Sequence, residues 1–269
     1  MLATCGVIGL MSLVRDGGFR MPPFVRTLLE AILGLAVIAV AWVVIATGAG
    51  ASAAKLPSLP VVFQKAIELA PSDEFLRHFG DSVSALVLGI LPALLAGVFF
   101  GMIAGMSRAT RWLLGPFAVT LGCTPLVVLV PLFFAWWGMG IATKAAAVFA
   151  LVAFPIMNMV MVATGAKRRV VVVSGSESRR HAPVVDIDST NTAAVAAAIV
   201  GGLRVGLVIG VSALVIVEFM AANHGVGYFI AQSASTGDMT STLAGIGIVA
   251  VPTILTATFL QAIQEQVAG

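Results

Sequence analysis

Residues 83–105, VSALVLGILPALLAGVFFGMIAG, decide the class of this protein. The stretch has no charged side chain, and its apolar residues follow one another without regular alternation. A helix that crosses the hydrocarbon core of a bilayer needs about 20 consecutive apolar residues, and this stretch is long enough. A strand of a membrane β-barrel would instead alternate apolar and polar residues. The stretch therefore predicts a membrane-spanning helix.

Five other stretches of similar length are also continuously apolar: 28–48, 112–137, 145–166, 192–217 and 243–263. Hydrophobic residues make up 59% of the 269 residues, and charged residues only 10%. A soluble domain has about 25% charged residues, so this chain has too few charges to cover a surface in water. We therefore predict an all-α membrane protein with about six transmembrane helices.

The distribution of Lys and Arg predicts how these helices are oriented. When the loops are taken alternately, one set carries Arg15, Arg20, Arg26, Arg108, Arg111, Lys167, Arg168, Arg169, Arg179 and Arg180. The other set carries only Lys55, Lys65, Arg77 and Lys144. Because cytoplasmic loops are enriched in Lys and Arg, both termini and the loop at 167–191 are predicted to be cytoplasmic.

This topology divides the chain into parts. We predict a cytoplasmic tail (1–27), a first transmembrane helix (28–48), an external loop (49–82) and a core of five helices (83–269) that includes the cytoplasmic loop at 167–191. The external loop contains a short amphipathic stretch near residues 61–69. Met1 and Met21 both remain open as the start of the chain, since the residues after Met21 form an ordinary basic lead-in to the first span.

Small residues recur at a fixed spacing in two of the predicted spans. Glycines stand every four residues at Gly97, Gly101 and Gly105, and again at Gly202, Gly206 and Gly210. Small residues at this spacing let the backbones of two membrane helices approach closely. We therefore predict that both sets lie at helix–helix contacts.

The sequence lacks the features of an enzyme. It has no G-x-x-x-x-G-K-[ST] phosphate loop and no H-E-x-x-H metal motif. Cys5 and Cys123 lie far apart, and the three histidines are scattered, so we predict no catalytic residue, no metal site and no cofactor in this chain. Glu30, Arg204 and Glu218 fall near the ends of the predicted spans, which leaves no ionisable group in mid-membrane. The net charge of +3 forms no basic patch, which argues against a nucleic-acid partner.

One polar segment, VVVVSGSESRRHAPVVDIDST at residues 170–190, interrupts the apolar chain. It can be a solvated connecting loop. It can also hold a short helix that docks on a soluble partner, because Ser174 stands three residues before Glu177 as in a capping box. Pro183 would end such a helix.

Four motifs give the chain a family resemblance: LPSLP at 56–60, CTPLVVLVPLFFAWWGMG at 123–140 followed by Lys144, GGLRVGL at 201–207 and VIVEFMAANHGVGYFI at 215–230. In this order and spacing they resemble the permease subunits of type I ATP-binding-cassette importers, in the branch that imports nitrate, sulfonates and taurine. The similarity extends from about residue 56 to residue 261.

The resemblance implies a type I importer permease fold in a bacterial inner membrane and three kinds of partner. These are a second permease subunit, identical or different, an ATPase dimer that binds ATP and Mg, and an external substrate-binding protein. It also implies that Glu218, Asn223, Gly225 and Gly227 form an external gate or a contact for the binding protein. For Glu218, an interfacial carboxylate in water is an equally open interpretation.

The loop at 167–191 stands where such permeases carry the coupling loop that docks on the ATPase. The coupling residues would be Ser174, Gly175, Ser176, Glu177, Arg179, Arg180 and His181. They do not match the Glu-Ala-Ala consensus of the family. The loop can therefore dock on a diverged ATPase, leave coupling to a partner permease, or be non-functional.

These observations predict a transmembrane subunit of an ATP-driven importer, which forms the pathway for a small solute, with a sulfonate or nitrate as candidates. A secondary transporter driven by an ion gradient is an alternative. The lack of buried ionisable groups and of a detectable inverted repeat argues against it. A membrane partner subunit that transports nothing is the other alternative.

Overall fold

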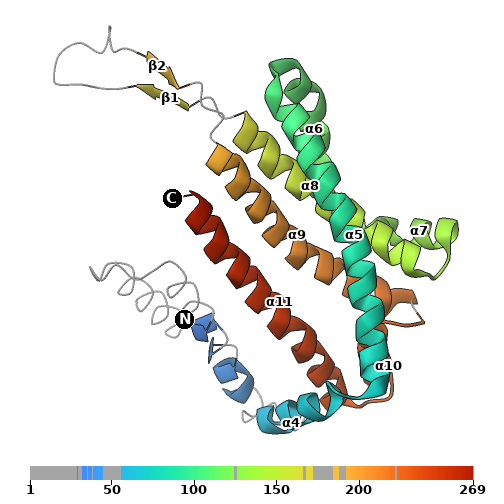
Figure 1. The fold of residues 1–269 in the computed structure, drawn as a ribbon. Helices are drawn as coiled ribbons and strands as arrows, with labels where there is room; N and C mark the ends of the chain where they lie inside the picture. The colour runs from blue at the N-terminus through green and yellow to red at the C-terminus, as the bar shows by residue number, and fades with distance from the viewer. Residues whose placement is uncertain are drawn as a thin grey trace.

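The computed structural model describes residues 29, 32–34, 36–37, 39–44, 56–123, 126–165, 168–171, 184–187, 192–221 and 223–268. Its helices are α4 (Leu59–Leu69), α5 (Asp73–Met106), α6 (Arg108–Cys123), the 3₁₀ helix η1 (Leu126–Leu129), α7 (Val130–Trp137), α8 (Ile141–Thr164), α9 (Thr192–Ala221), α10 (Val226–Ser235) and α11 (Met239–Ala268). Two strands, β1 (Arg168–Val171) and β2 (Val184–Ile187), lie between α8 and α9. Figure 1 shows the helices as one bundle, with the hairpin projecting from one end.

Four of the described helices are long and apolar enough to cross a membrane: α5, α8, α9 and α11. A shorter apolar helix lies at Ile32–Val44, within the predicted first span. The prediction of an all-α membrane protein is confirmed, with the β1–β2 hairpin as a small addition in one loop.

Helix α5 begins at Asp73, before the predicted start at residue 83, because the residues there form a good helix start. The Ser72 side chain accepts a hydrogen bond from Phe75 N. Asp73 and Glu74 lie in the first turn, where the positive end of the helix dipole stabilises acidic side chains. The part predicted as an external loop therefore holds the first turns of α5. It also holds α4, which matches the predicted amphipathic stretch.

The predicted span at 112–137 is not one helix. Helix α6 ends at Cys123, and η1 and α7 follow as short separate helices. Proline has no backbone N–H and clashes with the preceding turn, so it breaks a helix interior but suits a first turn. Pro125 stands in the sequence between α6 and η1, and Pro131 occupies the first turn of α7.

The glycines of α5 face α8. A Cβ atom at Gly97 would lie 2.8 Å from Ile156 Cβ, and one at Gly101 would lie 2.8 Å from Val160 Cβ. Gly105 makes the same kind of contact with Thr164. The partner positions advance together along the two chains, so α5 and α8 run in the same direction with their backbones in close approach.

The second set of glycines contacts the same helix from another side. A Cβ atom at Gly206 would lie 2.7 Å from Val152 Cγ1, and one at Gly202 would lie 3.3 Å from Ile156 Cα. Gly210 approaches Val152 and Val148. The order of the partners is reversed, so α9 runs antiparallel to α8. Helix α8 is thus enclosed between two glycine faces, and Val148, Val152, Ile156 and Val160 are fully buried there.

The loop between α8 and α9 is an antiparallel hairpin in its described parts. Arg168 pairs with Ile187, and Val171 pairs with Val184. Both strands contain consecutive valines, whose β-branched side chains favour extended backbone over helix. The predicted helical turn at Ser174–His181 lies outside the described residues.

Candidate functional site

A buried ion pair joins α8 to α9. Lys144 Nζ lies 3.0 Å from Glu218 Oε1, and the two side chains are 8% and 0% exposed. The sequence placed Lys144 in an external loop and Glu218 at the edge of the membrane. In the structure Lys144 lies in the first turn of α8, which begins at Ile141, and Glu218 lies in the last turn of α9, which ends at Ala221. Burial of each charge is tolerated because the other neutralises it at close range.

The Glu218 carboxylate has two further donors. The Ser82 hydroxyl of α5 lies 2.8 Å from both carboxylate oxygens, and Gly227 N donates to Oε2 at 2.9 Å. Ser82 Oγ in turn accepts from Val226 N at 2.8 Å. Val226 and Gly227 are the first residues of α10, so the anion and the hydroxyl satisfy backbone donors that a helix start leaves unpaired.

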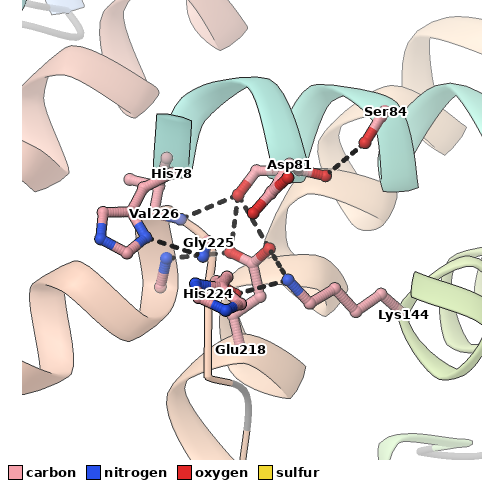
Figure 2. Close-up of polar contacts among 10 residues, drawn as sticks. His78, Asp81, Ser84, Lys144, Glu218, His224, Gly225 and Val226 are labelled. Atoms are coloured by element: carbon pink, nitrogen blue, oxygen red, sulfur yellow. Dashed lines mark hydrogen bonds and ion pairs between the residues drawn. The ribbon is translucent and has the colours of Figure 1, made fainter. Parts of the chain in front are cut away.

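The turn before α10 is held by two basic side chains. Lys144 Nζ donates to the carbonyl oxygen of His224, and the His78 ring accepts at Nδ1 from Gly225 N at 3.1 Å. Figure 2 shows Lys144 and Glu218 pointing toward one another, with the main chain of 224–226 beside them. We call Ser82, Lys144, Glu218 and the main chain of 224–227 the polar clamp. It ties α5, α8, α9 and α10 together at one point.

Two positions in the polar clamp require glycine. Gly225 has φ +121° and ψ 165°, a conformation open essentially only to glycine. A Cβ atom there would lie 2.1 Å from Glu218 Oε1. At Gly227, a Cβ atom would lie 2.5 Å from Val215 O and 2.7 Å from Glu218 Cβ. The Glu218 carboxylate therefore fits beside this turn only because positions 225 and 227 have no side chain.

The structure brings together three of the four residues of the predicted external site. Glu218, Gly225 and Gly227 are in contact in the polar clamp, while Asn223 is exposed at its rim. Glu218 is only 1% exposed, so the alternative of an interfacial carboxylate in water is wrong. In this conformation its carboxylate is also closed to direct contact with a soluble protein.

Sequence reasoning missed Lys144, Ser82 and His78. A signal existed for the first, because a lone Lys beside one apolar run and a lone Glu at the end of another, on the same predicted side, should find each other. No pattern marked Ser82 or His78. Their roles depend on where α5 crosses α10, which the sequence does not encode locally.

Among the residues that the structure describes, no three His, Cys, Asp or Glu side chains gather as a metal site.

An apolar groove of about 170 Å³ leads away from the polar clamp. Its walls come from α5, α9 and α11, with Leu86, Leu207, Leu214 and Ile248 among the lining residues. Ser82, Glu218 and Val226 line its end at the polar clamp. Figure 1 shows α5 and α11 starting near α10 and running apart from there.

The proposed coupling residues, Ser174, Gly175, Ser176, Glu177, Arg179, Arg180 and His181, lie outside the described residues. The described hairpin strands place the start and end of this loop at the end of the bundle opposite the polar clamp.

Comparison with known proteins finds transport permeases among the similar sequences. No family model matches the chain. The chain is 27% identical over 252 residues to the taurine transport system permease protein of Escherichia coli (strain K12). The aligned residues cover 91% of this chain and 90% of that protein. It is 29% identical over 233 residues to a putative aliphatic sulfonates transport permease protein of Bacillus subtilis (strain 168), covering 86% and 83%.

A third relative is the formylaminopyrimidine transport permease protein of Halalkalibacterium halodurans, 24% identical over 204 residues, with 74% of this chain and 79% of that protein covered. Together with the four long apolar helices, these relatives indicate a multi-pass membrane protein that is similar to transport permeases. The chain is similar to permease subunits of ATP-binding-cassette transporters, among them taurine and sulfonate permeases.

Proposed function

We propose that this chain is the transmembrane subunit of an ATP-driven importer in a bacterial inner membrane, with both termini in the cytoplasm. It pairs with a second permease subunit and receives solute from an external binding protein. An ATPase dimer on the cytoplasmic side binds ATP and Mg and supplies the energy. The observation that carries the proposal is the similarity to transport permeases over about nine-tenths of the chain and of the E. coli relative.

The apolar groove is the natural candidate for this subunit's half of the solute pathway. Its one charged lining residue, Glu218, is neutralised by Lys144, so the wall offers no net charge to trap a passing solute. The polar clamp lies at its external end in the predicted topology and serves as the external gate. A small solute such as a sulfonate or nitrate would be selected mainly by the binding protein.

The loop at 167–191 is the proposed contact with the ATPase, through Ser174, Gly175, Ser176, Glu177, Arg179, Arg180 and His181. Charge reversal of Arg179 and Arg180 together should abolish co-purification of the ATPase, because the contact would lose two cations. Arg77→Glu, on the predicted external side, is the matched control and should leave the complex intact. Full recovery of the ATPase with the Arg179→Glu/Arg180→Glu variant would contradict the assignment.

The decisive experiment is purification of the tagged chain from its native membrane, with identification of the proteins that accompany it. We expect an ATP-binding-cassette ATPase and a permease, identical or different. Proteoliposomes of that complex should take up solute only with the binding protein outside and ATP inside. A chain that purifies without any ATPase under conditions that keep a known importer intact would refute the proposal.

A secondary transporter is a second candidate, and one observation favours it. The buried Lys144–Glu218 pair supplies the ionisable groups that the sequence analysis found to be missing. Buried charges within membrane proteins often mark ion or proton pathways. Solute uptake by the isolated chain in ATP-free vesicles with a proton or sodium gradient would support this candidate, and absence of such uptake would exclude it.

A further inference from the structure

Three successive backbone N–H groups at the start of α10 each have a side-chain acceptor. Those of positions 226 and 227 donate to Ser82 Oγ at 2.8 Å and to Glu218 Oε2 at 2.9 Å. The third, Gly225 N, donates to the ring nitrogen Nδ1 of His78 at 3.1 Å (Figure 2). His78 and Ser82 lie about one turn apart on α5. The turn that leads into α10 is therefore fixed to α5 at two points.

The hydrogen bond from Gly225 N defines the protonation state of the His78 ring. A backbone N–H group can only donate, so Nδ1 must accept with a free lone pair, and the ring is a neutral imidazole. The imidazolium form carries a proton on both nitrogens and has no acceptor. Proton uptake at Nδ1 would therefore leave Gly225 N–H without this partner and place two donors against each other. Histidine is the side chain that ordinarily changes its charge near neutral pH.

The His78 ring can exchange protons with water at the α10 end of the bundle. It is half-buried and lines a polar cavity of about 560 Å³, whose wall also includes Asn223 and Gln232. This end of the bundle is external in the predicted topology. A change in the external pH can therefore reach the ring.

The groups around the His78 ring carry both signs of charge. The carboxylates belong to α5 and α9: Glu74, Asp81 and Glu218. The other titratable groups belong to α5, α8 and the start of α10: Arg77, Lys144, His224 and Tyr228. Burial of the ring disfavours the imidazolium form, and the carboxylates favour it. No single partner therefore fixes the charge of this ring.

We propose that His78 is a pH-dependent switch at the external gate. As a neutral imidazole it holds Gly225 and the start of α10 against α5, and proton uptake from the external side releases them. The hydrogen bond is present at high pH and is lost as the pH falls, since the released ring binds a proton more readily than the bonded ring does. The effect on transport rests on the proposed function, because it assumes that the polar clamp is the external gate.

The release is tested on the purified chain in detergent, by hydrogen exchange of the backbone N–H groups of residues 223–229. The measurement is made at about pH 7.5 and about pH 5.5, on either side of the ordinary imidazole pKa of about 6.5. After correction for intrinsic exchange rates, the protection in the wild type should fall about fivefold at the lower pH, which matches the usual net contribution of one hydrogen bond.

Two variants of His78 and one control separate this ring from its neighbours. His78→Gln keeps an acceptor but cannot titrate, so its protection should be equal at both pH values. His78→Ala should be less protected than the wild type at the higher pH and insensitive to pH. His224→Gln removes the neighbouring imidazole and should respond to pH as the wild type does. A wild type without a pH response, or His78 variants with the wild-type response, would overturn the inference.

The effect on the gate is measured in proteoliposomes of the complete importer, with ATP inside at constant pH and no binding protein. Hydrolysis of ATP by the wild type should rise by up to about fivefold as the external pH falls, because the closed gate has lost one hydrogen bond. It should stay constant in His78→Gln. A pH response of exchange without one of hydrolysis would refute the role in gating. Absence of any ATPase from the purified wild-type chain would instead refute the proposed function, and the exchange experiment would still decide whether His78 releases the turn.

Discussion

Lys144 carries a positive charge into a part of the bundle where only 7% of its surface is exposed. Removing such a charge from water costs several kcal/mol, and the cost is recovered only when the partner and its hydrogen bonds are all in place. Here Glu218 supplies the opposite charge, and the His224 carbonyl oxygen accepts a second hydrogen bond from the ammonium. A single substitution in this pair should therefore lower the free energy of unfolding by more than the intact pair contributes to it.

The polar clamp predicts an asymmetry between single and double variants. Lys144→Met leaves the Glu218 carboxylate buried without its cation, and should destabilise the protein by about 3–5 kcal/mol. Adding Glu218→Gln to this variant should recover part of the loss, because no unpaired charge then remains. Thermal unfolding of the purified protein in detergent gives the comparison.

Lys65→Met is the matched control. Lys65 forms an exposed pair with Glu68 at 3.9 Å, and such pairs contribute about 0–1 kcal/mol. A Lys144→Met variant as stable as Lys65→Met would contradict the importance given to the buried pair.

Gly225 and Gly237 make a second matched pair, since both have positive φ. Gly237→Ala places its methyl group in open space and should cost about 1 kcal/mol from the backbone alone. Gly225→Ala should cost clearly more, because it adds a contact with the Glu218 carboxylate to a strain of about 1–3 kcal/mol. Equal melting temperatures for the two variants would show that the carboxylate can move aside.

At the scale of elements, the glycines of α5 determine how close α8 can come. Gly101→Leu should sharply reduce the yield of monodisperse protein, because even a Cβ atom would lie 2.8 Å from Met157 O and Val160 Cβ. Overpacking in a tight contact costs about 1–3 kcal/mol or more. Gly80→Leu, in the same helix with open space around it, should leave yield unchanged. Normal yield for Gly101→Leu would mean that α5 and α8 do not pack in this way.

The sequence predicted these elements unevenly. Continuous apolar runs predicted α5, α8, α9 and α11 well, since crossing a bilayer demands one length and one composition. The four-residue glycine spacing predicted contact faces but not that both sets meet on α8, because partner choice depends on distant parts of the chain. The run at 112–137 was misjudged, since Pro125 and Pro131 separate short helices there and do not merely kink one continuous span. In the polar clamp, Glu218, Gly225 and Gly227 were found by resemblance, whereas Lys144 was taken for a loop charge.

At the scale of the whole molecule, the polar clamp and the β1–β2 hairpin lie at opposite ends of the bundle (Figure 1). The charge distribution predicts that the hairpin end is cytoplasmic. In a background with Cys5 and Cys123 replaced by serine, Ser176→Cys should react with a membrane-impermeant thiol reagent only from the cytoplasmic side. Gly237→Cys, in the turn after α10, should react only from outside. Labelling of both positions from one side would overturn the topology.

The close contact between the backbone at Gly225 and the carboxylate of Glu218 has an evolutionary consequence. A lineage that replaced the acidic residue with a short side chain would remove the clash at the turn, and a methyl group at 225 would then face only the strain of the backbone. The reverse order is blocked, because a side chain at position 225 would clash with the carboxylate while Glu218 is still present. Related sequences should therefore lose the two residues in a fixed historical sequence, acid before glycine, and ancestral reconstruction should reveal that direction.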